Sequence, residues 1–185
     1  MAEPRRMPER VNLGKHYHTS MAALTGRKRD YNENAYHDRR DDLRVVMGFY
    51  LPTWQRGLVW TEKQKVAFIE SAWRGINLGT YTYNQAPLGS PYDNLLIDGQ
   101  QRLHAVECYL NDEFPVFGWR WSDVTIVDKR IWDMSIGFAS YVTETEDENY
   151  LRSYYDLMNF GGTAHRETER ASPCDFAYPK DKFPC

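Results

Sequence analysis

The prediction of a fold for this chain begins at residues 95–103, which read Leu95-Leu96-Ile97-Asp98-Gly99-Gln100-Gln101-Arg102-Leu103. The three apolar residues at the start are typical of a short buried strand, and the Asp-Gly pair that follows breaks it. Apolar residues then recur at helical spacing, at Leu103, Val106 and Leu110. The stretch therefore predicts a strand, a tight turn and a helix, with polar residues crowded where the strand and the helix meet.

This predicted junction has the properties of an anion-binding site. The first turn of a helix carries backbone N–H groups without partners and a partial positive charge, which together attract phosphate. Gly99 would let a ligand approach the backbone closely, and Arg102 would add a forked donor suited to phosphate oxygens. Asp98 is suited to hold a metal ion, a ribose hydroxyl or a proton. A purely structural interpretation stays open, in which Asp98 only caps the helix and Arg102 lies in solvent.

Length and composition limit the kind of protein. The chain has 185 residues, which suits one domain, and its net charge of −3 does not indicate a nucleic-acid partner. No apolar run approaches the roughly 20 residues of a membrane span, and residues 1–10 lack the apolar core of a signal peptide, so no membrane partner is expected. The three cysteines have no paired short spacing, which argues against a disulfide framework or a zinc site and favours a cytoplasmic location.

Periodicity and turn signals predict an α+β fold. The clearest helix covers residues 62–74, because Thr61 and Gln64 have the spacing of a capping box and apolar residues follow at helical intervals. Residues 114–121 are aromatic and broken by a glycine, so they favour either a short strand or a hydrophobic flap. The remaining predicted elements are a short helix near 38–47, a strand over 78–83, a strand over 94–97 antiparallel to it, a strand over 136–142 and a helix over 147–159.

Composition divides the chain into three parts. Residues 1–44 are polar with an excess of Arg and Lys, and we expect a solvated basic extension rather than a phosphate-contacting arm. Residues 45–170 hold most of the predicted strands and helices and form the domain. Residues 171–185 contain three prolines and are expected to be an irregular tail.

Four motifs occur in a fixed order along the chain. They are Leu51-Pro52-x-Trp54-Gln55-Arg56-Gly57-x-Val59-Trp60, Ile69-Glu70-Ser71, Ile97-Asp98-Gly99-Gln100-Gln101-Arg102-Leu103 and Met158-Asn159-Phe160-Gly161-Gly162-Thr163. The most specific combination is the DGQQR box with the upstream Gln-Arg pair and tryptophan. On these motifs the chain resembles the DUF262 family, the N-terminal module of GmrSD-type modification-dependent restriction systems. The resemblance covers about residues 45 to 168.

The resemblance implies both a fold and a function. The family resembles the ParB/sulfiredoxin fold, in which helices flank a small mixed sheet and nucleotide phosphates bind at a strand–helix junction. In characterised relatives the DGQQR box is associated with binding and hydrolysis of nucleoside triphosphates, coupled to sensing or restricting modified DNA. We therefore expect a nucleoside triphosphate with Mg²⁺ as the cofactor, DNA or a DNA-processing protein as a further partner, and a role in DNA restriction or phage defence.

Matching positions carry the family's site residues onto this chain. The nucleotide site would be formed by Asp98, Gly99, Gln100, Gln101 and Arg102, with Gln55 and Arg56 across from it and Asn159, Gly161 and Gly162 closing it. Phosphoryl transfer depends mainly on positioning and charge neutralisation. The resemblance thus implies that Asp98 would bind Mg²⁺ or orient water. Gln100 or Gln101 would position the attacking water, and Arg102, together with Arg56, would neutralise phosphate charge.

Two other functions stay open. A non-enzymatic module would keep the fold and bind DNA or a partner protein to modulate a defence system, and exposed aromatic side chains would favour it. A small-molecule kinase is the other alternative, since the ParB fold serves that purpose elsewhere. Cleavage of DNA by this chain alone is not expected, because relatives that restrict DNA carry a C-terminal nuclease domain with an HNH-like motif, which this sequence lacks.

Overall fold

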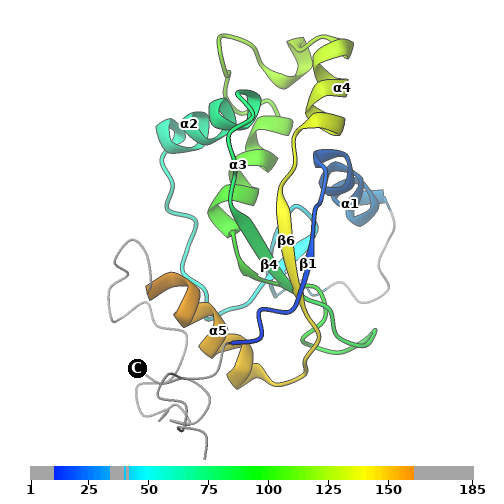
Figure 1. Ribbon diagram of the computed structural model, residues 1–185, viewed down its shortest axis with the longest axis vertical. Helices are drawn as coiled ribbons and strands as arrows, with labels where there is room; N and C mark the ends of the chain where they lie inside the picture. Colours follow the sequence, from blue (N-terminus) through cyan, green and yellow to red (C-terminus); the bar gives the residue numbers. More distant parts are fainter. Residues whose placement is uncertain (1–10, 34–39, 41, 161–185) are drawn as a thin grey trace, which may run out of the picture.

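The predicted strand and helix on either side of Asp98 and Gly99 are present, and the strand lies inside a mixed sheet (Figure 1). The computed structural model describes residues 11–33, 40 and 42–160, apart from the side chain of Phe160. The strands are β1 Lys15–Tyr17, β2 Arg44–Val46, β3 Phe49–Leu51, β4 Thr80–Asn84, β5 Leu95–Asp98 and β6 Ala139–Thr143. The helices are α1 Met21–Glu33, α2 Glu62–Trp73, α3 Gln100–Leu110, α4 Ile126–Ser135 and α5 Glu148–Phe160, with a short 3₁₀ helix at Trp121–Asp123. The α+β class predicted from the sequence is confirmed, and within the described residues no helix has the length and apolar character needed to cross a membrane.

The sheet has the strand order β1-β6-β4-β5-β3-β2. β4 pairs with β5 in antiparallel fashion, as the sequence predicted, and with β6 in parallel, while β5 pairs in parallel with β3. β1 and β2 are the edge strands, antiparallel to β6 and β3 respectively. β5 therefore runs through the interior of the sheet, with a paired strand on each side.

Side chains alternate along β5 and enter two separate cores. Leu96 belongs to the larger core, which is covered by α1, α2, α3 and α4. Leu95 and Ile97 belong to the smaller core, where they pack with Leu151 and Tyr154 of α5. Figure 1 shows α5 apart from the other four helices, as this division requires. The C-terminal end of β5 therefore lies between α3 on one side and α5 on the other.

The helix α2 begins where the sequence predicted. The Thr61 side chain accepts a hydrogen bond from the backbone N–H of Gln64 at 3.4 Å, and the Gln64 side chain accepts one from the N–H of Thr61 at 2.9 Å. This reciprocal pair satisfies two N–H groups that the helix itself cannot. The strands predicted over 78–83 and 136–142 and the helix over 147–159 correspond to β4, β6 and α5.

Residues 15–33 belong to the fold rather than to a solvated extension. β1 adds an edge to the sheet, and α1 buries Met21 and Leu24 in the larger core. Because these are the only two buried side chains of α1, its sequence lacks the repeating apolar pattern by which a helix is predicted. The boundary at residue 44 predicted from composition therefore does not separate the sheet from an extension.

The predicted helix near residues 38–47 is wrong where the structure describes it. Residues 44–46 form β2, and the chain turns into β3 through Met47 and Gly48, whose φ angles are 52° and 78°. Two-residue hairpin turns of type I′ need positive φ at both positions and favour Asn-Gly there. Because methionine is not a turn residue, the sequence carried only half of the signal.

Candidate functional site

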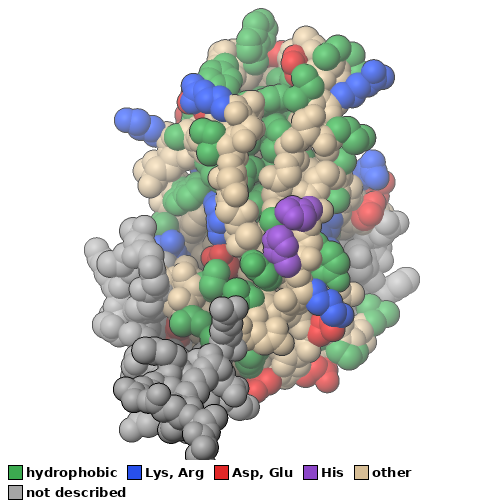
Figure 2. Space-filling view, in the orientation of Figure 1, with side chains coloured by type: hydrophobic (Ala, Val, Ile, Leu, Met, Phe, Trp, Pro, Cys, Tyr) green, Lys and Arg blue, Asp and Glu red, His purple; other side chains and the backbone are tan. Residues whose placement is uncertain are grey.

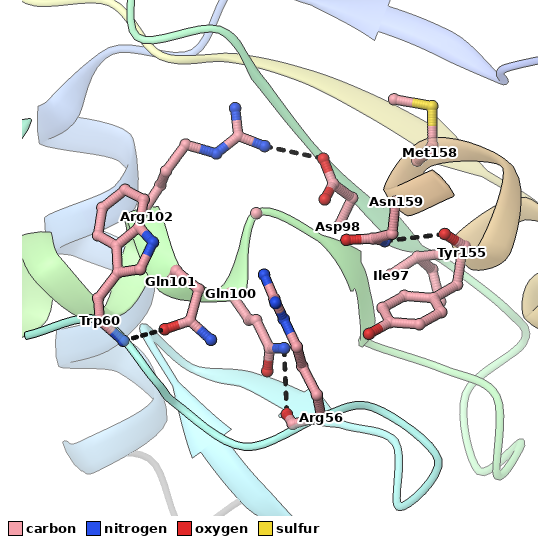
Figure 3. A pocket seen from close by; sticks show the side chains of 11 residues that line it. Arg56, Trp60, Ile97, Asp98, Gln100, Gln101, Arg102, Tyr155, Met158 and Asn159 are labelled. Carbon is pink, nitrogen blue, oxygen red and sulfur yellow. Dashed lines mark hydrogen bonds and ion pairs between the residues drawn. The ribbon is translucent and has the colours of Figure 1, made fainter. Parts of the chain in front are cut away.

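The end of β5 and the start of α3 form one wall of a cavity of about 220 Å³ (Figure 3). Three segments contribute to the lining, namely the loop before α2, the β5–α3 junction and the last turns of α5. The lining residues are Arg56, Trp60, Ile97, Asp98, Gly99, Gln100, Gln101, Arg102, Tyr155, Met158 and Asn159. The structure therefore brings together, from three segments that lie far apart along the chain, seven residues that the sequence predicted for the site: Arg56, Asp98, Gly99, Gln100, Gln101, Arg102 and Asn159.

The turn between β5 and α3 depends on Gly99. Its φ of +94° lies in the left-handed region, and a Cβ atom at this position would lie 2.6 Å from Cβ of Tyr81 on β4. Gly99 is also the N-cap residue of α3 and offers no side-chain hydrogen bond, so Asp98 does not cap the helix. The first N–H groups of α3 are therefore left to a ligand or to solvent.

Arg102 is fixed rather than free in solvent. Its Nη2 donates to Oδ2 of Asp98 at 2.8 Å, and the two side chains are only 24% and 17% exposed. Its Nη1 approaches the carbonyl oxygen of Leu78 at 3.4 Å and passes over Gly79, where a Cβ atom would lie 2.6 Å from Nη1. The Asp98 carboxylate offsets part of the Arg102 charge and holds the guanidinium at the edge of the cavity.

The two glutamines of the DGQQR box hold the loop before α2 against α3. Gln101 Oε1 accepts from the backbone N–H groups of Val59 and Trp60 at 3.0 and 3.1 Å, and its Nε2 donates to the carbonyl oxygen of Gly57 at 2.9 Å. Gln100 Nε2 donates to the carbonyl oxygen of Arg56 at 3.1 Å. The Oε1 atom of Gln100 is buried and accepts no hydrogen bond within the described residues. Gln101 therefore anchors the loop with its whole amide, and Gln100 keeps one acceptor unused.

The pair Gln55-Arg56 is divided between two roles. Gln55 is buried, and its Nε2 donates to the carbonyl oxygens of Leu96 and Ile97 at 2.6 and 2.9 Å, so it binds β5 and does not line the cavity. Arg56 is half-buried, and in Figure 3 its guanidinium points into the cavity. Within the described residues Arg56 belongs to no ion pair. Its charge is thus available to an anion in the cavity.

The third wall comes from α5. Asn159 lines the cavity, and its Nδ2 donates to the carbonyl oxygen of Tyr155 at 2.8 Å, which leaves its oxygen as the group to face a ligand. Tyr155 and Met158 complete this wall and were not predicted from the sequence, although Tyr155 lies four residues before Asn159, a spacing that places both on one helix face. Trp60 was also missed as a lining residue. The predicted residues Gly161 and Gly162 lie outside the described residues.

Few groups in the cavity could hold a metal ion. Asp98 is its one carboxylate, and the described residues contain no cluster of three or more His, Cys, Asp or Glu suited to a metal. Oδ2 of Asp98 is occupied by Arg102, so Oδ1 is the atom able to bind a cation. Mg²⁺ accepts a single protein carboxylate when phosphate and water complete its shell, so the residues fit Mg²⁺ bound together with a phosphate ligand.

Comparison with known proteins gives one match. The family model for the GmrSD restriction endonuclease, N-terminal domain, matches residues 33–170, which include every residue of the cavity lining. No curated protein and no solved structure matches the chain. The match confirms the resemblance inferred from the four motifs, while the similarity to the ParB/sulfiredoxin fold stays a prediction.

Proposed function

Because the chain belongs to the family of the GmrSD restriction endonuclease N-terminal domain, we propose that it binds a nucleoside triphosphate at the β5–α3 junction and hydrolyses it in DNA restriction or phage defence. The observation that carries the proposal is the cavity where Arg56, Arg102 and the uncapped start of α3 meet. All three favour an anion; Arg102 lies in the first turn of α3, and Arg56 comes from the loop before α2. A volume of about 220 Å³ suits the phosphates rather than a whole nucleotide.

The charged residues of the cavity and the three glutamines around it have defined tasks in this proposal. The phosphates lie against the first turn of α3, and Arg56 and Arg102 offset their charge. Asp98 Oδ1 holds Mg²⁺, which would supply further charge neutralisation when bound. Gln100 Oε1 receives no hydrogen bond from the residues that the structure describes, so it is suited to accept one from an attacking water. Gln101 and Gln55 keep the loop that carries Arg56 in place.

Nucleotide binding is tested by a panel of ATP, GTP, CTP and UTP, each with and without Mg²⁺. At a hundredfold excess over the dissociation constant, the binding nucleotide is expected to stabilise the fold by about 2.7 kcal/mol. Thermal unfolding measures this, and release of inorganic phosphate measures turnover. Arg56→Ala should reduce the stabilisation, whereas Arg74→Ala, an exposed arginine at the end of α2 and outside the cavity, should not. Unchanged unfolding with every nucleotide and with inorganic phosphate would contradict the proposal.

Gly79 offers a second test, through the position of Arg102. Gly79→Ala adds a methyl group where the Arg102 guanidinium now lies, so we expect weaker triphosphate binding. The matched control is Gly75→Ala, because Gly75 has a similar φ (+73° against +76°) and open space around its Cβ position. Both variants should lose about 1–2 kcal/mol of stability from backbone strain, but only Gly79→Ala should lose affinity in calorimetric titration. Equal affinities in the two variants would mean that the position of Arg102 does not matter to the ligand.

A non-enzymatic role as a binding module is supported by a different observation. Large aromatic side chains are exposed on the segment between α3 and α4, with Trp119 62% and Phe117 50% exposed. A binding module would retain nucleotide without turnover, or bind none, and the panel separates these results. A small-molecule kinase would transfer the phosphoryl group to an acceptor molecule. It would release inorganic phosphate only when water takes the place of that acceptor.

A further inference from the structure

A second cavity, of about 380 Å³, lies where the end of α2, the end of α3 and the segment leading into α4 meet. Four aromatic side chains and two carboxylates line it, namely Trp73, Tyr109, Phe117, Trp119, Asp123 and Asp128. None of these residues lines the cavity at the β5–α3 junction. The second cavity is therefore a separate feature, and its chemistry does not depend on nucleotide binding.

The aromatic side of this cavity is presented by a strained turn. Val116 and Trp119 exchange two backbone hydrogen bonds of 2.9 and 3.0 Å, and the residues between them, Phe117 and Gly118, have φ angles of 50° and 85°. Phenylalanine is a costly residue in the left-handed region, where Asn, Asp and Gly are preferred. Phe117 and Trp119 are also largely exposed, so burial in the core does not explain why large aromatic residues occupy this costly turn. Strained turns of this kind are frequent at binding sites.

The carboxylates of the cavity are not neutralised by any basic side chain that the structure describes. Neither Asp123 nor Asp128 belongs to an ion pair within the described residues. The hydroxyl of Thr125 donates to Oδ2 of Asp128 at 2.5 Å, which fixes this carboxylate on the first turn of α4. Burial raises the pKa of Tyr109, and the charges of Asp112 and Asp128 raise it further, so the negative field extends into the aromatic cluster.

Two basic side chains of this region, Arg74 and Lys129, already have other contacts. Arg74 pairs with Glu70 at 3.4 Å while its guanidinium lies 4.8 Å from the centre of the Phe117 ring. The Lys129 ammonium lies 5.4 Å from the centre of the Trp121 ring, which is not part of the cavity lining. The contact of Arg74 demonstrates that the Phe117 ring accepts a guanidinium on its face, as aromatic rings commonly do.

We propose that this cavity receives an arginine side chain of a partner polypeptide. Aromatic faces together with carboxylates attract a cation on an apolar stem, and a guanidinium stacks on aromatic rings better than an ammonium does. The helix α4 next to the cavity also exposes apolar side chains, namely Ile126 (67%), Val127 (60%), Ile131 (44%) and Met134 (78%). A polypeptide could cover this apolar surface, whereas a free small cation could not. Figure 2 shows hydrophobic side chains at the end of the molecule where Figure 1 places α2 and α4. Aromatic pockets bordered by apolar surface are typical of protein interfaces.

The proposal is tested with Nα-acetyl-arginine N-methylamide as the probe and the citrulline analogue as its uncharged isostere. Two-dimensional NMR follows the indole N–H signals of the full chain without nucleotide, and Trp73→Phe and Trp119→Phe assign them. We expect saturable shifts of the Trp73 and Trp119 signals with the arginine probe only. Asp123→Asn and Asp128→Asn should each weaken binding by about two- to fivefold. Asp133→Asn, on α4 but outside the cavity, should leave it unchanged.

Three results would overturn the proposal. Equal shifts with the arginine and citrulline probes would mean that the cavity binds apolar stems without regard to charge. Tighter binding of the corresponding lysine probe would assign the cavity to an ammonium instead. Absence of any indole shift up to the solubility limit of the probe would exclude the cavity as an arginine site. The variant Trp119→Ala, at an exposed position, shows the shifts that remain when this wall of the cavity is removed.

Discussion

Replacing Gly99 with alanine is expected to lower the free energy of unfolding by about 3 kcal/mol, the combined cost of a left-handed backbone and of steric overlap. The φ of +94° disfavours any residue with a Cβ atom, and the new atom would lie 2.6 Å from Cβ and 3.1 Å from Cα of Tyr81. Tyr81 is 2% exposed and belongs to β4, so it cannot move without disturbing the sheet. Urea denaturation followed by circular dichroism measures the loss.

The control for this variant is Gly89→Ala. Gly89 has nearly the same φ, +87°, but nothing lies within 4 Å of its Cβ position. This variant should therefore lose only the backbone contribution, about 1–2 kcal/mol. The difference between the two variants isolates the close approach of the β5–α3 turn to β4. If both variants lost the same amount of stability, the close contact with Tyr81 would not be what requires glycine at position 99.

Replacing Arg102 with alanine is expected to weaken triphosphate binding by about 1.5–3 kcal/mol, or roughly 10- to 150-fold, since a charge-assisted contact to phosphate is lost. Calorimetric titration measures the affinity, and thermal unfolding checks that the fold persists. Arg102 is at the rim of the cavity and 24% exposed, so the loss of stability should be much smaller than for Gly99→Ala. Unchanged affinity, or a large fall in unfolding temperature, would make Arg102 a structural residue.

The Asp98 carboxylate complicates this variant, because Arg102→Ala leaves it without its partner. Inorganic phosphate without Mg²⁺ provides a simpler probe, since Asp98 then has no cation to bind. Asp98→Asn should tighten phosphate binding by removing a like charge, whereas Arg102→Ala should weaken it. Combining both substitutions in a double-mutant cycle separates the pair's mutual interaction from the contact of each residue with the ligand.

The β5–α3 junction could be predicted because its signals are local. A short apolar run, an Asp-Gly pair and helical spacing all lie within residues 95–110, and no distant contact changes their meaning. The same holds for the capping box of α2. By contrast, β1 was not predicted, since it becomes a strand only by pairing with β6, more than a hundred residues away. The Met47-Gly48 turn has the glycine of a hairpin turn but methionine where asparagine is usual, so β2 was mistaken for part of a helix.

The candidate site could be predicted only in part, for a related reason. The charged residues of the DGQQR box line the cavity, but the tasks of the glutamines depend on backbone atoms 41 to 44 positions away. A glutamine that binds water and one that binds a carbonyl oxygen look alike in a sequence. Part of the α5 wall could have been predicted, because Tyr155 lies four residues before the predicted Asn159 and shares a helix face with it.

The glutamine contacts have a consequence for how the cavity can open. Through them Gln55, Gln100 and Gln101 close a segment of the chain that contains α2 and β4. Arg56 cannot leave its place by the fraying of a single turn, since its release breaks this closure and disorders a larger unit. The cavity should therefore open together with a cooperative part of the molecule and not as an independent flap. Ligand exchange is therefore expected to leave this loop in place, because release of the loop would be as slow as sub-global unfolding.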